Sequence, residues 1–263
     1  MSLLLVDGNN LLFRAFFGFP ERLRADGKPI QGVIGFSHML SKMVRIAKAT
    51  HTLVAFDPVE RHTRRDLLED YKQNRPSYRN KPDRENPFSQ FDDILATLTH
   101  LAIPHIQQSG YEADDVIASM ALRAAAADID VVIGSSDTDF LQLVSDRIMV
   151  MRYQGENSFF FTKQSVEAKF GVPPSQYLAY KALVGDKADN IPGAGGIGPK
   201  TALKVLRGER ILNEEEQAIF ERNKELIAFQ TDMELPMTFE ELHMPVFPNG
   251  SMIAGALREL GMV

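Results

Sequence analysis

The sequence predicts an α/β fold, in which a mostly parallel central sheet is flanked by helices and followed by a helical region. Short apolar runs typical of buried strands alternate with longer segments of helical spacing, a pattern that favours β–α–β units. Acidic residues stand at or just beyond the ends of three of these runs, at the edge where open α/β sheets collect ligand sites. From Thr162 onward the spacing is helical.

The first part of the chain is predicted to form one α/β core over residues 1–161. Its expected strands are Leu3–Val6, Thr52–Phe56, His105–Gln107 and Val131–Gly134. The segments with helical spacing between them are Val33–Ala47, Phe88–Leu101 and Asp114–Ala126. Strands that alternate with helices in this way predict a parallel sheet covered on both faces.

Residues 162–263 are predicted to form a helical region. Thr162 suits the N-cap of a helix that ends near Phe170, because its side chain can accept from the first turn. Further helices are expected over about 175–184, 199–207 and 214–230. The last thirty residues show no clear pattern and are expected to be irregular.

Composition excludes several classes of protein. Hydrophobic residues make up 44% of the 263 residues, which is ample for a buried core. Cysteine is absent, so disulfides, zinc fingers and cysteine nucleophiles are excluded and a reducing compartment fits. The first apolar run stops at Asp7, whereas a membrane span needs about 20 residues. We therefore expect a soluble, cytoplasmic protein with no membrane partner.

Residues 71–87 are predicted to form an exposed, irregular segment. They contain three prolines and clustered basic residues and tyrosines, without apolar periodicity. In isolation such a run is readily explained as a solvated connection, but a long irregular segment inside a compact domain is usually functional. Basic residues beside aromatic rings suit single-stranded nucleic acid.

Residues 193–198, Gly-Ala-Gly-Gly-Ile-Gly, form a glycine-rich turn with three possible interpretations. A dinucleotide fingerprint is rejected because no strand precedes the turn. An NTPase phosphate loop is rejected because Pro199 separates Gly198 from Lys200 and removes a backbone donor. A helix–hairpin–helix fits, since Pro199 suits the first turn of a helix whose N–H groups bind DNA phosphate without reading sequence. A plain helical packing motif remains the alternative.

Nine acidic residues occur in compact sets. They are Asp7; Asp57; Glu112, Asp114 and Asp115; Asp137 and Asp139; and Asp186 and Asp189. Taken singly, each set has a structural explanation: Ser109–Glu112 fits a capping box, Asp137 can cap the next helix, and Asp189 can close a turn. Taken together they predict a site, because Asp7, Asp57 and Asp137 end strands that should be neighbours.

Converging carboxylates predict a bound cation. Like charges raise one another's pKa and oppose folding unless a cation neutralises them. Oxygen ligands without cysteine or a histidine cluster suit Mg²⁺ or Mn²⁺, and two such ions ~3.5–4 Å apart can clamp a phosphoryl displacement. Once nine of the 35 acids are assigned to one site, the rest are outnumbered by the 29 lysines and arginines, so the net charge of −6 does not exclude a nucleic-acid partner.

Six segments resemble the 5′-nuclease (flap endonuclease) family in order and spacing, over residues 3 to about 235. They are Leu5-Val-Asp-Gly-Asn-Asn-Leu-Leu-Phe-Arg14, Phe56-Asp57, Tyr71-Lys-Gln-Asn-Arg75, Gly110-Tyr-Glu-Ala-Asp-Asp-Val116, Ser136-Asp-Thr-Asp139 and Gly185-Asp-Lys-Ala-Asp-Asn-Ile-Pro-Gly193. The likeness is closest to the nuclease domain of bacterial DNA polymerase I and to stand-alone bacterial 5′–3′ exonucleases. It implies a PIN-like core with a helix–hairpin–helix near residues 175–207. The implied activity is a 5′–3′ exonuclease or flap endonuclease of DNA replication and repair, which hydrolyses phosphodiester bonds by a two-metal-ion mechanism to leave a 5′-phosphate and a 3′-hydroxyl.

The resemblance also implies roles for individual residues. All nine acids match metal ligands, with Asp186 and Asp189 nearest the second ion and Asp7 close to both. Lys72 and Arg75 match the basic residues of the family's arch, with Arg14 assisting, as groups that stabilise charge on the scissile phosphate. Backbone carbonyls are implied as a potassium site at Leu183, Val184, Pro192, Ala194 and Ile197. DNA contacts are implied for Lys181, Gly193, Gly195, Gly196, Gly198, Lys200 and Lys204, and Arg207 adds charge on the same side.

The expected cofactors are two Mg²⁺ ions, for which Mn²⁺ can substitute, and K⁺ at the hairpin. The expected partner of a monomeric enzyme is DNA with 5′ flaps or 5′ ends. Two alternatives stay open: a catalytically silent protein that binds branched DNA, and a small-molecule phosphatase of similar architecture. The complete set of nine acids weighs against the first, and the exposed basic segment and hairpin weigh against the second.

Overall fold

The computed structural model describes residues 1–58, 68, 70–74, 76–78, 80–235, 237–244 and 246–263. Within this part of the chain, the centre is a six-stranded sheet in the order β3-β2-β1-β4-β5-β6. The strands are β1 (Ser2–Asp7), β2 (His51–Phe56), β3 (His105–Gln107), β4 (Asp130–Gly134), β5 (Ile148–Arg152) and β6 (Phe159–Phe161). All neighbours pair in parallel except β5 and β6, which are antiparallel.

The predicted mostly parallel sheet is confirmed, and the four predicted strands are β1 to β4. β5 and β6 were not predicted. Three of the five residues of β5, Ile-Met-Val-Met-Arg, are methionine or arginine, which are not strong strand formers, and β6 has three residues. Both are fixed by pairing with neighbouring strands rather than by local propensity.

The helices largely match the predicted ranges. They are α1 (Gly8–Gly18), α2 (Gln31–Ala47), α3 (Phe91–His100), α4 (Ala113–Ala126), α5 (Lys163–Phe170), α6 (Pro174–Val184), α7 (Pro199–Leu206), α8 (Glu214–Ile227) and α9 (Gly250–Glu259). Thr162 caps α5 as expected, by accepting from the backbone N–H of Ser165. Within the described residues, no helix combines the length and apolarity needed to cross a bilayer.

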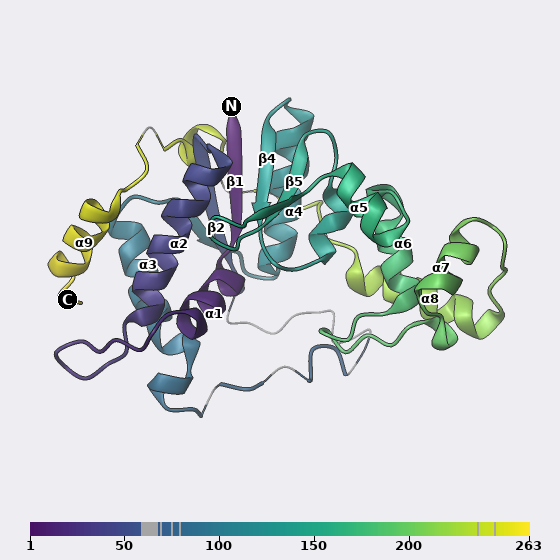
Figure 1. The fold of residues 1–263 in the computed structure, drawn as a ribbon, viewed down its shortest axis with the longest axis horizontal. Coiled ribbons are helices and arrows are strands. Elements are labelled where there is room, and N and C mark those ends of the chain that lie inside the picture. The colour runs from purple at the N-terminus through teal and green to yellow at the C-terminus, as the bar shows by residue number, and fades with distance from the viewer. Residues whose placement is uncertain (59–67, 69, 75, 79, 236, 245) are drawn as a thin grey trace.

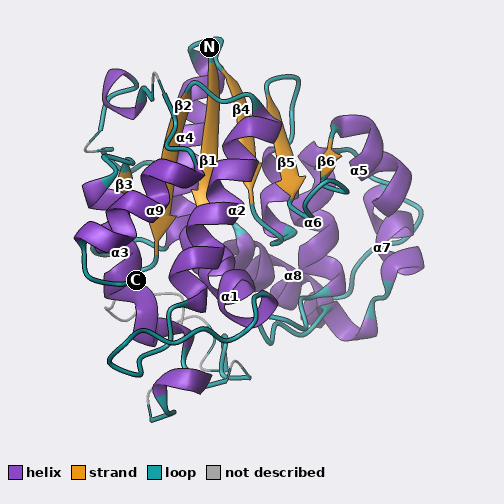
Figure 2. Ribbon diagram, turned by 60° about the vertical axis from the view of Figure 1, so that its left-hand side comes forward, coloured by secondary structure: helices purple, strands orange, loops and turns teal. Residues whose placement is uncertain are grey.

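Helices cover both faces of the sheet (Figure 2). Successive side chains of a strand point to opposite faces, so β1 contributes Leu3 and Leu5 to one core and Leu4 and Val6 to the other. The core that contains Leu4 is closed by α1, α2 and α3, and the other by α4 and the helices around α6. Burial on both faces explains why these strands are continuous apolar runs.

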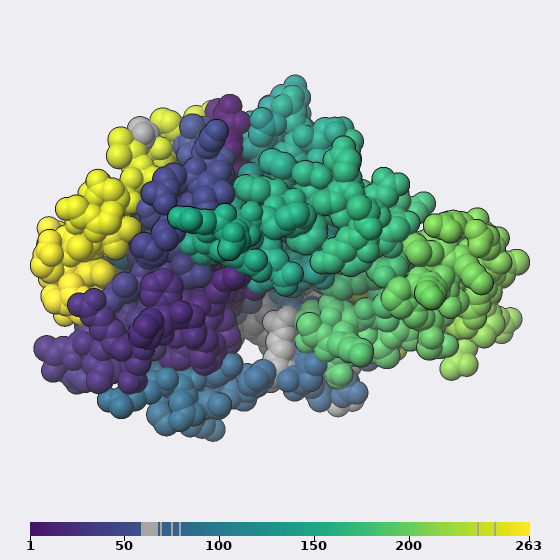
Figure 3. Space-filling view, in the orientation of Figure 1, coloured from purple at the N-terminus to yellow at the C-terminus, as the bar shows by residue number. Residues whose placement is uncertain are grey.

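The prediction that the last thirty residues are irregular is wrong. Asn249 caps α9, whose buried side chains include Ile253 and Leu257. This helix packs on α2 and α3, at the opposite end of the molecule from α7 and α8 (Figures 1 and 3). The division of the chain at residues 161 and 162 stays a prediction, and its second part includes a segment that packs on the first.

The hairpin between α6 and α7 is tightly folded. A Cβ on Gly193 would meet the carbonyl oxygen of Val184 at 2.5 Å, so only glycine allows this approach. Asn223 of α8 is fully buried and donates through Nδ2 to the carbonyls of Ala182, 2.9 Å away, and Pro192, 2.7 Å away. One side chain therefore satisfies a carbonyl near the C-terminal end of α6 and fastens the hairpin to α8.

We expect Asn223→Ala to lower the free energy of unfolding by ~1–3 kcal/mol, because two carbonyls lose their buried donor. Urea unfolding followed by circular dichroism measures this change. Gln217→Ala is the matched control, since Gln217 lies on the exposed side of α8 and its side chain donates to Glu221, which is also on that helix. Equal stabilities of the two variants would show that Asn223 does not hold the hairpin.

Candidate metal centre

The acidic residues at the ends of the strands converge at the carboxyl-terminal end of the sheet. β2, β1 and β4 are adjacent, so Asp57, Asp7 and Asp137 lie just past neighbouring strand ends, as predicted. The chain runs outward from β1 to β3 and then returns to β4 on the other side of β1. The acids therefore lie beside the topological switch point, where open parallel sheets form their binding crevice.

Asp7 is the last residue of β1 and the N-cap of α1. Its Oδ1 accepts from the backbone N–H of Asn10, 2.9 Å away, and its Oδ2 accepts from Ser135 Oγ, 2.8 Å away. Burial, together with the nearby charges of Asp57 and Asp137, raises the pKa of Asp7 to about 7 despite these hydrogen bonds. A carboxylate held so near its neighbours is stable in its charged form only beside a cation.

The N-terminus of α4 adds three acids. Glu112 is the N-cap, and its backbone N–H donates to Asp115 Oδ2, so the capping box is Glu112–Asp115 and not the predicted Ser109–Glu112. Asp115 Oδ1 accepts from the backbone N–H of Gln230, 2.9 Å away. Backbone N–H groups thus donate to both carboxylate oxygens of Asp115. Asp115 is therefore suited to position α4 and to contact an ion through a water molecule.

Asp57 and Asp114 connect α4 to the strand ends. Asp57 accepts from Asn9 Nδ2 at 3.0 Å and from the backbone N–H of Ala113 at 2.9 Å. Burial and the charges of Asp7 and Asp137 raise the pKa of Asp114 well above its usual value. The acids of β1, β4 and α4 therefore share one electrostatic environment.

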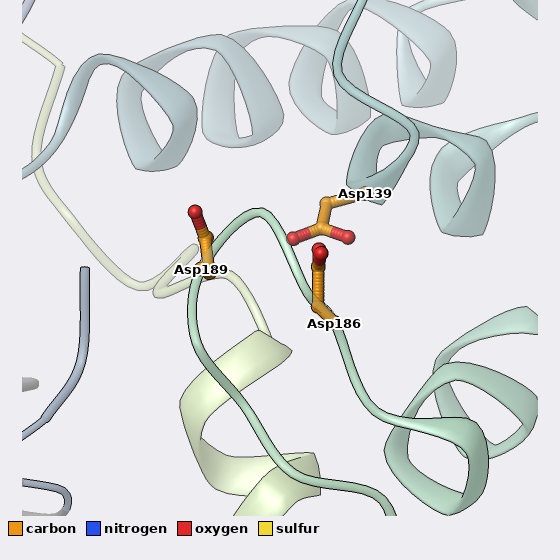
Figure 4. A group of neighbouring side chains, drawn as sticks. All are labelled: Asp139, Asp186 and Asp189. Atoms are coloured by element: carbon orange, nitrogen blue, oxygen red, sulfur yellow. The ribbon is translucent and has the colours of Figure 1, made fainter. Parts of the chain in front are cut away.

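A second group of acids combines the turn after β4 with the hairpin. Carboxylate oxygens of Asp139, Asp186 and Asp189 all lie within 4.8 Å of one another (Figure 4). Asp186 and Ile191 exchange two backbone hydrogen bonds, of 2.8 and 2.7 Å, and so close a tight loop that carries both hairpin acids. Residues almost fifty positions apart in the sequence thereby face one another.

Lys181, for which the resemblance implies a place near bound DNA, has a buried side chain. Its Nζ pairs with Asp139 and, at 2.6 Å, with Asp186 Oδ2, and the DNA contact stays a prediction. Burial alone would raise the pKa of Asp186, but Lys181 outweighs it and holds that pKa below its usual value. In this conformation the ammonium belongs to the acid cluster and not to the surface.

Lys72 also lies inside the cluster. Its Nζ is 3.1 Å from both carboxylate oxygens of Glu112, and its backbone N–H donates to the carbonyl of Asp189. Burial alone would lower the pKa of Lys72, but Glu112 outweighs it and raises that pKa. The prediction of an exposed segment is wrong at its start, because Tyr71 is 4% exposed and Lys72 is largely covered. Arg75 lies outside the described residues.

Three polar contacts explain this burial. Lys72 N, Asn74 Nδ2 and Asn190 Nδ2 link residues 70–74 to the loop of Asp186 and Asp189. The ring of Tyr71 packs with Ile191 and Leu226 in a small core of its own. Segments more than a hundred residues apart are therefore joined next to the acids.

The remaining predicted residues lie around this centre. Arg14 is one turn beyond Asn10 on α1 and lines a recess with Ser135 and Ser136. The exposed side chains near the hairpin include those of Lys200, Lys204 and Arg207, which lie on or directly after α7. Of the carbonyls proposed for potassium, that of Pro192 accepts from Asn223 and that of Ala194 from the backbone N–H of Ile197.

The sequence analysis missed the polar residues that orient the acids. Asn9 holds Asp57, Ser135 holds both Asp7 and the backbone N–H of Asp137, and Asn10 accepts from Ser136. The available signal was their position, since each lies within three residues of the end of β1 or β4. Hydrogen bonds of this kind fix the rotamers of metal-binding carboxylates.

The donor set fits a divalent cation. Every acid offers oxygen, and the close triad of Asp139, Asp186 and Asp189 has nearly the spacing of ligands to one ion. These carboxylates lie at the switch point of a parallel sheet, beside a glycine-rich hairpin with exposed lysines. This combination is typical of a metal-dependent nuclease. Comparison with known proteins makes the assignment specific.

The chain belongs to the 5′-3′ exonuclease family. Residues 2–171 match its N-terminal resolvase-like domain, and residues 172–214 match its C-terminal SAM fold. A 5′-3′ exonuclease of Aquifex aeolicus is 35% identical over 276 residues, covering 99% of this chain and 92% of that protein. DNA polymerase I of Caldicellulosiruptor bescii is 37% identical over 218 residues, covering 81% of this chain and 25% of the polymerase, so the likeness spans about a quarter of that relative.

Solved structures share the fold. The T5 5′-exonuclease with bound zinc has a TM-score of 0.70 and 22% identity, covering 86% of this chain and 89% of that one. The catalytic core of Rad2 in complex with DNA substrate has a TM-score of 0.55 and 15% identity, covering 98% and 86%. The predicted family and fold class are confirmed.

We expect metal-free protein to lose stability as the pH rises from about 4 to about 7. Asp7 ionises near 3.8 when unfolded and near 7 when folded, so its ionisation opposes folding across this window. Raised pKa values of Asp114 and Asp137 act in the same direction. Mg²⁺ should therefore raise Tm more at about pH 7.5 than at about pH 5, as measured by thermal unfolding with Mg²⁺ or EDTA. A Tm shift that is equal at both pH values would contradict this expectation.

Proposed function

We propose that this protein is a structure-specific 5′-nuclease that hydrolyses DNA phosphodiester bonds at 5′ ends and flaps, leaving a 5′-phosphate and a 3′-hydroxyl. The observation that carries the proposal is the convergence of acids from β1, β2, β4, α4 and the hairpin on one oxygen-only centre beside Lys72. Family membership supports it, because relatives over most of the chain are named 5′-3′ exonuclease.

The nine acids would hold two divalent ions, for which we propose Mg²⁺. Asp137, Asp139, Glu112 and Asp114 would serve the first, Asp186 and Asp189 the second, and Asp7 both, while Asp57 and Asp115 act through bound water. When bound, such ions neutralise the phosphate and activate water for in-line attack. Ser135 and Asn9 keep Asp7 and Asp57 oriented, so that the centre needs little rearrangement.

The basic residues have the task of binding substrate. Lys72, Arg75 and Arg14 would bind the scissile phosphate and stabilise the charge that develops on it. The hairpin glycines and Lys200 and Lys204 would bind duplex phosphates without reading sequence, which makes affinity salt-dependent. Carbonyls of the hairpin would bind K⁺, and we infer a cytoplasmic monomer that acts in DNA replication and repair.

The test is incubation of the protein with a 5′-labelled flap substrate, in Mg²⁺ or in EDTA, beside a 3′-labelled blunt duplex. We expect Mg²⁺-dependent release of a labelled product from the branch point. A phosphatase treatment that changes the mobility of the downstream strand identifies its 5′-phosphate.

The alternative is a silent protein that recognises DNA branches. It predicts intact substrate that is retained in a gel shift, with no cleavage in Mg²⁺ or Mn²⁺. That result would overturn the proposed nuclease, because the acids would then have no catalytic task.

A further inference from the structure

Lys181 is a buried cation that the proposed reaction does not yet use. It lies in the last turn of α6, is 7% exposed, and pairs through Nζ with Asp139 and with Asp186 Oδ2 at 2.6 Å. Thr138 Oγ1 accepts from the same nitrogen at 3.3 Å. A buried ammonium needs anions to compensate its lost hydration, so these two carboxylates are its structural partners.

Asp186 belongs with Asp189 to the pair proposed for the second ion, and Asp139, proposed for the first, completes the close triad. The triad oxygens lie within 4.8 Å of one another, and Asp189 is its third member (Figure 4). Mg²⁺ binds oxygens at about 2.0–2.1 Å, so two ligands of one ion lie no more than about 4.2 Å apart. An ion held there would compete with the ammonium for the oxygens of Asp139 and Asp186.

We propose that Lys181 is a built-in counter-ion of the triad that competes with the second divalent ion, an inference that rests on the proposed two-ion site. Without metal, the ammonium of Lys181 bridges Asp139 and Asp186 and offsets the repulsion between their carboxylates. When the ion binds, the flexible side chain of Lys181 moves its ammonium away from the acids. A substrate phosphate beside the centre then offers the ammonium a new anionic partner, so DNA favours occupation of the second site.

Lys72 does not share this role, although it is also buried among acids. Its Nζ bonds both oxygens of Glu112, which is not part of the triad. The two lysines therefore neutralise different halves of the centre. Competition through Lys181 should affect the second ion more than the first, because Glu112, Asp114 and Asp137 would also hold the first.

The test is a titration of DNA-free protein with Mn²⁺, with free Mn²⁺ measured by electron paramagnetic resonance. Wild-type protein should bind a second ion at least tenfold more weakly than the first. Lys181→Met removes the charge and keeps the stem length, and should tighten the second ion at least tenfold. Lys169→Met is the matched control for net charge, because Lys169 is exposed on α5, and should leave both Kd values unchanged.

Thermal unfolding separates competition from loss of fold. Without metal, Lys181→Met should melt below wild type, since the triad loses its counter-ion, and Mn²⁺ should raise its Tm by more than that of wild type. Lys181→Gln repeats the test with a neutral side chain that can still donate a hydrogen bond.

Two results would overturn the inference in different ways. Equal second-ion Kd values in wild type and both Lys181 variants would exclude competition and leave the two-ion site standing. Binding of a single ion by all three proteins would remove the second site itself and, with it, the two-ion form of the proposed function. Loss of the second ion in Asp186→Asn places that ion in the triad.

Discussion

Asp137→Ala should reduce cleavage of a flap substrate by about 10³-fold or more, while the Kd for the same DNA in Ca²⁺ changes little. Asp137 follows β4 at the centre of the acids, its backbone N–H donates to Ser135, and its Oδ1 accepts from the backbone N–H of Asp139. Its removal would therefore take away a proposed ligand and loosen the start of the next turn. Single-turnover cleavage and fluorescence anisotropy measure the two quantities separately.

Asp130→Ala is the matched control. Asp130 is the first residue of β4, at the opposite end of that strand from the acids. It is exposed and pairs with Arg147. This variant should cleave at the wild-type rate. If Asp137→Ala also turns over normally, the assignment of the acids to metal ions is wrong.

Lys72→Ala should slow single-turnover cleavage by more than tenfold. The Lys72 ammonium is held against Glu112, and its backbone N–H bonds the carbonyl of Asp189, so it stands at the boundary between the acids and the hairpin loop. A phosphate drawn to the centre would meet this charge first. The slower rate should persist at saturating DNA, because the lost interaction stabilises charge that develops during reaction.

Lys72→Arg is the informative companion. Residue 72 has a φ of 56°, a left-handed conformation that costs alanine and arginine alike, so the backbone strain is shared by the two variants. Arginine keeps the charge and should recover much of the rate. A wild-type rate in Lys72→Ala, or equal losses in both variants, would remove the ammonium from the mechanism.

Much of the fold could be predicted from the residues alone. The buried strands are nearly continuous apolar runs, and each ends where an acid or a small polar residue begins, as Leu3–Val6 does at Asp7. Helix ends carried local signals, such as Thr162 before α5 and Pro199 at the start of α7. β5 and β6 were not predicted because pairing, rather than composition, makes them strands.

Part of the site could also be predicted, because consecutive strand-end acids in a parallel sheet must converge. The surroundings of Lys72 and Lys181 could not be predicted. Lys72 was expected on an exposed segment, and no local signal indicated that Lys181 is buried, yet both lie against carboxylates. Their charges suggest surface positions, and only the acids of distant segments make burial favourable.

The sequence by itself determined the class of fold, the family and the identity of the acids, since these depend on local periodicity and on residue type at fixed spacing. Only the tertiary structure decided which carboxylates lie together, which are held by backbone donors, and which lysine pairs with Asp139 and Asp186. Asp139 meets Asp186, and Tyr71 meets Ile191, across long stretches of chain. Contacts of this kind follow from the packing of whole elements, which no local pattern encodes.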